Sequence, residues 1–77
     1  MVCLTSLPVG SSVTIKGDGE SIKWEKVHNG KYAELIRTHT LASGEVKRLS
    51  EPMGRQGYVR AQDELDFRQG ALGWTQE

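Results

Sequence analysis

The residues best suited to chemistry gather between positions 47 and 60. The stretch contains four basic side chains and an aromatic ring: Lys47, Arg48, Arg55, Tyr58 and Arg60. Basic groups that follow a phosphate backbone, with an aromatic face for base stacking, commonly bind single-stranded nucleic acid. The same charges on an edge strand would instead block aggregation, and this second interpretation is favoured. Nucleic-acid binding through these five residues is kept as the alternative function.

The segment GRQG (54–57) lies within the same stretch. Backbone N–H groups of such a loop could face an anion. The segment lacks the lysine and the Ser or Thr of a P-loop, and we expect no helix to follow it. A plain turn is the favoured interpretation.

Patterns for catalysis and metal binding are weak. Glu25 and Glu34 would face each other on a convex hairpin, which offers no cleft to raise one pKa for acid–base work. His28 and His39 show no serine or cysteine partner with an orienting acid. Cys3 is expected to be a small, partly buried apolar group, and the sequence has no zinc-ligand spacing. We predict a protein that is not an enzyme, with no catalytic residues, metal or cofactor.

Length and composition bound the molecule further. At 77 residues the chain forms one domain, and its formal net charge is zero. Residues 1–60 carry nine basic and six acidic side chains, whereas 61–77 carry one and four. The acids Asp63, Glu64 and Asp66 would repel nucleic acid close to where the arginines attract it. Protein binding is therefore ranked above nucleic-acid binding.

The compartment is inferred from one cysteine and from hydropathy. Cys3 cannot form an internal disulfide, which favours a reducing compartment. No apolar run approaches the roughly 18 residues that a membrane span needs. The start, MVCLTSLPVGSS, lacks the basic and apolar regions of a signal peptide. We expect a soluble, cytoplasmic protein without a membrane partner.

Alternating side chains predict two strands early in the chain. In SVTIK (12–16), Val13 and Ile15 point to one side, which is the period of a half-buried strand. SIKWEKVH (21–28) is the second strand. The dipeptide Asn29-Gly30 follows and is typical of a two-residue hairpin turn.

That turn predicts the register of the hairpin. It places Trp24 opposite Leu35 and Glu25 opposite Glu34. The second pair brings like charges together, so either nearby lysines relieve it or the register shifts.

The same register sorts the two faces. Ile22, Trp24, Ala33 and Leu35 share the expected core side. Val27, Tyr32 and Ile36 share the outer side, where three apolar residues could form a protein-binding patch or a second core layer. The patch is favoured.

Glycine turns separate the remaining elements. Strands are expected at 31–41, fraying past Arg37, at 45–49 and at 57–60. A break is expected at 51–54, a 3₁₀ turn at 61–64 and a closing strand at 65–67. Residues 1–68 would form the domain and 69–77 a C-terminal tail, in which Trp74 either covers the body or anchors a partner. Short strands without a helix predict an all-β small barrel of five to six strands.

Three segments carry a resemblance to a known class. LPVGSSVTIKG, SIKWEKVHNGKYAELIR and GYVRAQDELDF resemble the first strand, central hairpin and ending of SH3-like small barrels of the KOW and Tudor type. The resemblance covers residues 7–67, and the segment SEPMGRQ has no counterpart. The chain's size and style are also similar to those of small bacteriophage or bacterial proteins. The class implies binding to peptides, nucleic acid or a larger assembly.

The predicted function combines these points. Aromatic residues make up 6% of the chain, too few for the groove that docks proline-rich peptides. We predict a small adaptor, inhibitor or assembly component that binds another protein or a second copy of itself. The expected contacts are Val27, Tyr32, Ile36 and Trp74.

Overall fold

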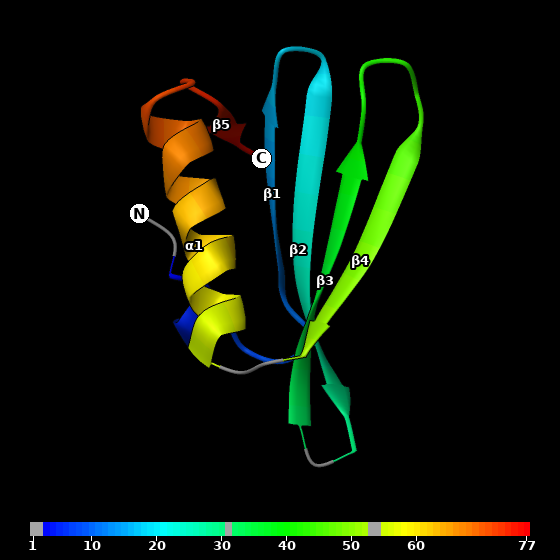
Figure 1. The fold of residues 1–77 in the computed structure, drawn as a ribbon, viewed down its shortest axis with the longest axis vertical. Helices are drawn as coiled ribbons and strands as arrows, with labels where there is room; N and C mark the ends of the chain where they lie inside the picture. The colour runs from blue at the N-terminus through cyan, green and yellow to red at the C-terminus, as the bar shows by residue number, and fades with distance from the viewer. Residues whose placement is uncertain (1–2, 31, 53–54) are drawn as a thin grey trace.

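The structure is a computed structural model. It describes the backbone of residues 3–30, 32–52 and 55–77, and the side chains of these residues except 29, 32, 51, 52 and 55. The elements in chain order are η1 (Leu4–Ser6), β1 (Ser12–Gly17), β2 (Glu20–Asn29), β3 (Tyr32–Thr40), β4 (Val46–Pro52), α1 (Arg55–Gly70) and β5 (Thr75–Gln76) (Figure 1).

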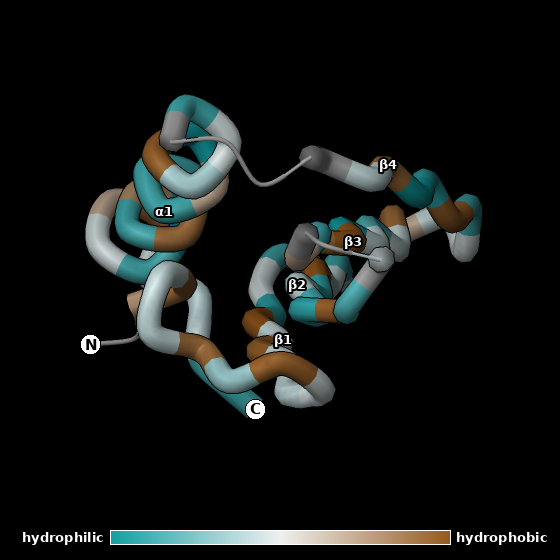
Figure 2. Tube along the Cα trace, turned by 90° about the horizontal axis from the view of Figure 1, so that it is seen from below, coloured by the Kyte–Doolittle hydropathy of each residue, from teal (hydrophilic) through white to brown (hydrophobic). Residues whose placement is uncertain are grey.

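The described strands form one open antiparallel sheet in the order β4-β3-β2-β1-β5. The first four strands follow one another as a meander, and β5 returns to pair with β1. Figures 1 and 2 show α1 on one face of this sheet, near β1 and β2, with β4 on the far side. The expectation of a β-rich domain is confirmed, but the described strands do not close into a barrel.

The early strand predictions are confirmed. Buried residues alternate along β1 as Val13 and Ile15, because successive side chains point to opposite faces. Among the described side chains, nine apolar residues are buried in the core: Leu4, Val13, Ile15, Ile22, Trp24, Leu35, Ala61, Leu65 and Trp74.

The hairpin register differs from the prediction. Asn29 pairs with Tyr32 and Trp24 pairs with Arg37, so the turn lies one residue later than the Asn29-Gly30 dipeptide suggests. Glu25 consequently faces Ile36, not Glu34. The observed register avoids the like-charge pair, which would be destabilising.

The shift leaves the two faces as predicted. Moving the turn by one residue slides each strand past its partner by two positions, which preserves the alternation. Ile22, Trp24 and Leu35 are buried, whereas Val27 and Ile36 are half-buried on the opposite face.

The segment 55–70 corrects the sequence analysis most strongly. The strands expected at 57–60 and 65–67 and the 3₁₀ turn expected at 61–64 are wrong, because all three lie in α1. Tyr58, Ala61 and Leu65 recur at helical spacing and pack on or in the core. On the same helix Glu64 accepts a hydrogen bond from Arg68 at 3.2 Å, one turn later.

Strand β3 also differs from expectation. It stays paired with β2 through Thr40 and does not fray past Arg37. Strand β4 extends to Pro52, into the expected break, whose residues 53 and 54 lie outside the described part. Pro52 ends the strand at the sheet edge, where its missing N–H is tolerated.

The C-terminal segment packs back onto the body. Helix α1 continues past position 68, the chain turns after Gly70, and Trp74 is buried. The indole N–H of Trp74 donates to Asp18 Oδ2 at 3.2 Å, and Arg68 lies 4.5 Å from the ring centroid. Of the two roles expected for Trp74, this placement corresponds to covering the body.

Candidate functional site

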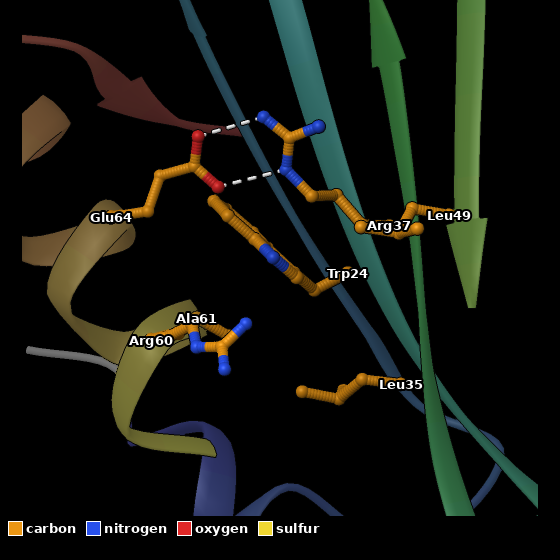
Figure 3. Close-up of a pocket in the computed structure, with 7 residues that line it drawn as sticks. All are labelled: Trp24, Leu35, Arg37, Leu49, Arg60, Ala61 and Glu64. Carbon is orange, nitrogen blue, oxygen red and sulfur yellow. Dashed lines mark hydrogen bonds and ion pairs between the residues drawn. The ribbon is translucent and has the colours of Figure 1, made fainter. Parts of the chain in front are cut away.

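A groove lies between α1 and the β3–β4 half of the sheet. Its volume is about 410 Å³, which is within the range of ligand pockets. It is lined by Trp24, Leu35, Arg37, Leu49, Arg60, Ala61 and Glu64 (Figure 3). The groove exists because α1 packs toward β1 and β2 and leaves the β4 side uncovered.

The apolar part of the groove comes mainly from the sheet. Trp24, Leu35 and Leu49 extend from three neighbouring strands toward the helix side. Trp24 and Leu35 are buried, but Leu49 is 51% exposed. An aliphatic side chain left this open beside a hollow is a candidate contact for a partner.

One ion pair forms a wall of the groove. Arg37 on β3 donates from Nε and Nη2 to the two carboxylate oxygens of Glu64 on α1, at 2.8 and 2.7 Å. This two-point contact fixes the helix relative to the sheet. Glu64 Oε2 also accepts from Arg68, so both of its oxygens are engaged.

These contacts set the pKa of Glu64. Partial burial raises it, but the hydrogen bonds and charges of Arg37 and Arg68 outweigh burial and hold the pKa of Glu64 below its ordinary value of 4.5. Glu64 is therefore an ionised structural partner and not an acid poised to donate a proton.

Two hydrogen-bond donors of the groove are unpaired. Arg60 has no ion-pair or hydrogen-bond partner among the described residues. Figure 3 shows its guanidinium extending from α1 toward the groove, apart from the Arg37–Glu64 pair. Trp24 Nε1 is buried and likewise has no partner in the described part of the chain.

The ion pair continues into a chain of polar contacts. His39 Nδ1 lies 3.4 Å from Arg37 Nη2, and its Nε2 lies 2.6 Å from Glu20 Oε1. Arginine can only donate, so Nδ1 accepts and Nε2–H donates to the carboxylate. Both ring nitrogens are thereby used, and no described serine, threonine or cysteine side chain bonds to this histidine.

The predicted protein-binding residues are not brought together. Val27 and Ile36 lie near each other on the sheet face opposite α1, because Ile36 pairs with Glu25 two residues before Val27. Trp74 is buried on the other face. The side chain of Tyr32 lies outside the described residues.

The predicted basic residues are also dispersed. Lys47 pairs with His39 and Arg48 with Thr38, so they point to opposite faces of β4. Tyr58 packs against the core, and Lys26 Nζ lies 5.1 Å from its ring centroid. Arg60 borders the groove, and the side chain of Arg55 lies outside the described part.

Cys3 is exposed and not partly buried, because η1 turns the next residue, Leu4, into the core instead. Within the described ranges, no three or more His, Cys, Asp or Glu side chains gather closely enough to hold a metal ion. In the same ranges no helix is long and apolar enough to cross a membrane.

Comparisons with protein-family models, with curated proteins and with solved structures find no match. The resemblance to SH3-like barrels stays a prediction, and the segment that carried its ending forms α1 instead.

Sequence reasoning missed most of the groove. Arg60 was singled out as a basic residue and Glu64 only as one of three acids that repel nucleic acid, whereas Leu49 and Arg37 were given no role in a site. The spacing of Glu64 and Arg68 four residues apart was the available sign of a helix. Once 55–70 is a helix, a cross-layer partner for Glu64 follows from the arginine on the inner face of β3.

Proposed function

We propose that the protein is a non-enzymatic binding module that accepts a segment of another protein in the groove between α1 and the β3–β4 half of the sheet. The observation that carries the proposal is the exposed Leu49 on the floor of a hollow that α1 leaves uncovered. The site lies on the opposite face of the sheet from Val27 and Ile36, which become a secondary surface. A cytoplasmic location stays part of this proposal.

The groove supports binding better than catalysis. The one carboxylate among its described lining residues is ionised and engaged by two arginines, and Arg37 and Arg60 cannot act as bases near neutral pH. A rigid ion pair at one wall and an apolar floor are features of a recognition site.

Strand β4 offers a matched pair of variants for the test. Leu49 and Val46 are both about half-exposed, at 51% and 57%, but they point to opposite faces of the strand. Leu49→Asp places a charge in the groove, and Val46→Asp places it on the outer face. Neither substitution removes a buried core side chain, so both variants are expected to fold.

The experiment compares cross-linked partners of the wild type with those of the two variants. We expect Leu49→Asp to lose a partner that the wild type and Val46→Asp both retain. Equal retention by all three proteins would remove the groove as the contact surface. Loss only in Val46→Asp would move the site to the face that carries Val27 and Ile36.

Nucleic-acid binding remains the alternative, but the described basic side chains form no gathered patch that favours it. Lys47 and Arg48 point apart, and Tyr58 packs against the core. The alternative predicts affinity that falls steeply with added salt, and a flat response would count against it.

A further inference from the structure

The unpaired polar groups that line the groove are hydrogen-bond donors. Among the described side chains that line it, the one carboxylate, Glu64, already accepts hydrogen bonds from Arg37 and Arg68. The guanidinium of Arg60 and the indole N–H of Trp24 have no acceptor among the described residues. The described lining residues therefore offer unpaired donors, and their one carboxylate is already engaged.

The formal charge of the lining residues also favours a ligand that accepts hydrogen bonds. Among the described lining residues, Arg37 and Arg60 contribute two positive charges and Glu64 one negative, which gives these residues a net charge of +1. The pair of Arg37 and Glu64 is internally neutralised, which leaves the charge at Arg60. An anionic group in the groove would complement it.

The unpaired indole adds an independent observation. Trp24 is 1% exposed, and its N–H has no protein acceptor among the described residues. A buried N–H without an acceptor costs free energy, because its bond to water is lost and not replaced. An acceptor that displaced the atoms covering Trp24 Nε1 would recover that free energy on binding.

From these observations we propose that the groove takes an acidic peptide segment, in which the carboxylate of an aspartate or glutamate lies between apolar residues. The carboxylate would pair with Arg60 and accept from Trp24, while the flanking apolar side chains would cover Leu35 and Leu49. This inference rests on the proposed function and specifies the partner's chemistry.

A protein segment suits the site better than a nucleic acid. Asp63 lies on α1 one turn after Arg60, and both side chains are exposed. A phosphate chain that reached Arg60 would therefore pass close to a carboxylate, whereas a single side-chain carboxylate need not. The apolar floor also favours aliphatic partners over a charged backbone.

The indole signals in a ¹H–¹⁵N NMR spectrum test the inference. The probe is a short peptide with blocked ends and one glutamate between leucines, and its twin carries glutamine. A third peptide has the glutamine and a free C-terminal carboxylate, and a short single-stranded DNA is the fourth probe. Trp74 is an internal reference, because its N–H already donates to Asp18.

We expect the glutamate peptide to move the Trp24 indole signal and to bind about tenfold more tightly than its glutamine twin, as a charge-assisted contact would. Arg60→Gln should abolish this preference. Arg48→Gln, on the other face of the sheet, should preserve it.

The contrary outcomes separate the two proposals. Equal binding of both twins at the Trp24 signal would overturn the carboxylate inference and leave the groove as a binding site. Tighter binding of the free C-terminal carboxylate, or a response to the DNA alone, would overturn the side-chain carboxylate as the recognised group. No response to any peptide would overturn the inference, and the variants Leu49→Asp and Val46→Asp would then decide separately whether the groove binds proteins.

Discussion

Lys26 shows how a single charged side chain can be accommodated inside a small core. It is 6% exposed, and its Nζ donates to the carbonyl oxygen of Thr5 at 3.0 Å. The same ammonium group lies 5.1 Å from the centroid of the Tyr58 ring. Lys26 thus joins β2 to η1 and to α1, and its aliphatic stem covers apolar surface.

We expect the contact between Lys26 and Tyr58 to produce a coupling free energy between these two residues. Tyr58→Leu should lower the free energy of unfolding by about 1 kcal/mol, because it removes the aromatic face under the cation. The loss should be smaller when Lys26 is replaced by Met. Denaturant unfolding of the four proteins in a double-mutant cycle measures the coupling, and strictly additive effects would contradict it.

Glu64 gives the protein a pH-dependent contact. Its folded-state pKa lies below the ordinary value of 4.5, so folding favours the ionised form. The associated stability is fully present above the unfolded-state pKa and is lost as pH falls through the folded-state pKa. The affected window therefore begins near pH 4.5 and extends below it.

Thermal unfolding measured from pH 7 to pH 3 tests this dependence. We expect Glu64→Gln to be less stable than the wild type at pH 7, by about 1–2 kcal/mol because the pair is partly screened by solvent. Its stability should change less on acidification. Asp63→Asn, an exposed neighbour on the same helix, is the control and should keep the wild-type profile.

At the scale of elements, strands β1 to β4 were predictable, whereas the helix and β5 were not. Val13 and Ile15 defined β1 through alternation, and the faces of β2 and β3 were correct although the turn lay one residue later. In 55–70, Gly57 and Val59 suggested a turn and a strand, which obscured the helical spacing of Tyr58 and Leu65. The low helix propensity of glycine and valine is a weak guide to secondary structure where tertiary packing stabilises a helix.

The groove could not be predicted from the sequence, for a different reason. Arg60 was recognisable as a basic residue of interest. Leu49 and Arg37 line the same groove as Arg60 only because α1 packs at a particular distance from the sheet. No local sequence pattern encodes that distance. The Arg37–Glu64 pair, which helps to set it, joins residues on different elements.

The contact between Gly17 and Trp74, the residue just before β5, predicts the effect of a substitution at Gly17. A Cβ atom built at this position would overlap the ring of Trp74. Gly17→Ala should therefore displace Trp74 and lower the free energy of unfolding by about 1–3 kcal/mol. Gly70→Ala is a suitable control, because no atom outside its helix lies within 4 Å of the added Cβ. Tryptophan fluorescence and thermal unfolding would measure both, and equal stability would contradict the close contact.

At the scale of the whole molecule, stability is unevenly distributed across the sheet. Strands β1, β2 and β3 contribute buried side chains to the core. In β4, the side chains of residues 46–50 are exposed. Because α1 lies toward β1 and β2, the β4 edge has few apolar contacts to hold it in place.

We expect amide hydrogen exchange to follow this asymmetry. The amides of β2 that pair with β1 and β3 should exchange most slowly, at rates close to those of global unfolding. Those of β4 should exchange much faster, through local opening of the edge. Equal protection of β2 and β4 would show that the sheet opens as one unit.

The order of contacts along the chain also bears on how the fold assembles in time. The pairings among β1, β2, β3 and β4 join strands that are neighbours in sequence. By contrast, Leu4 meets Gln62 across 58 positions, and Trp74 meets Asp18 across 56. Closing such long loops is slow, so the meander is expected to form first, with α1 and β5 joining it last. Damage to those late contacts would then speed unfolding and leave the folding rate nearly unchanged.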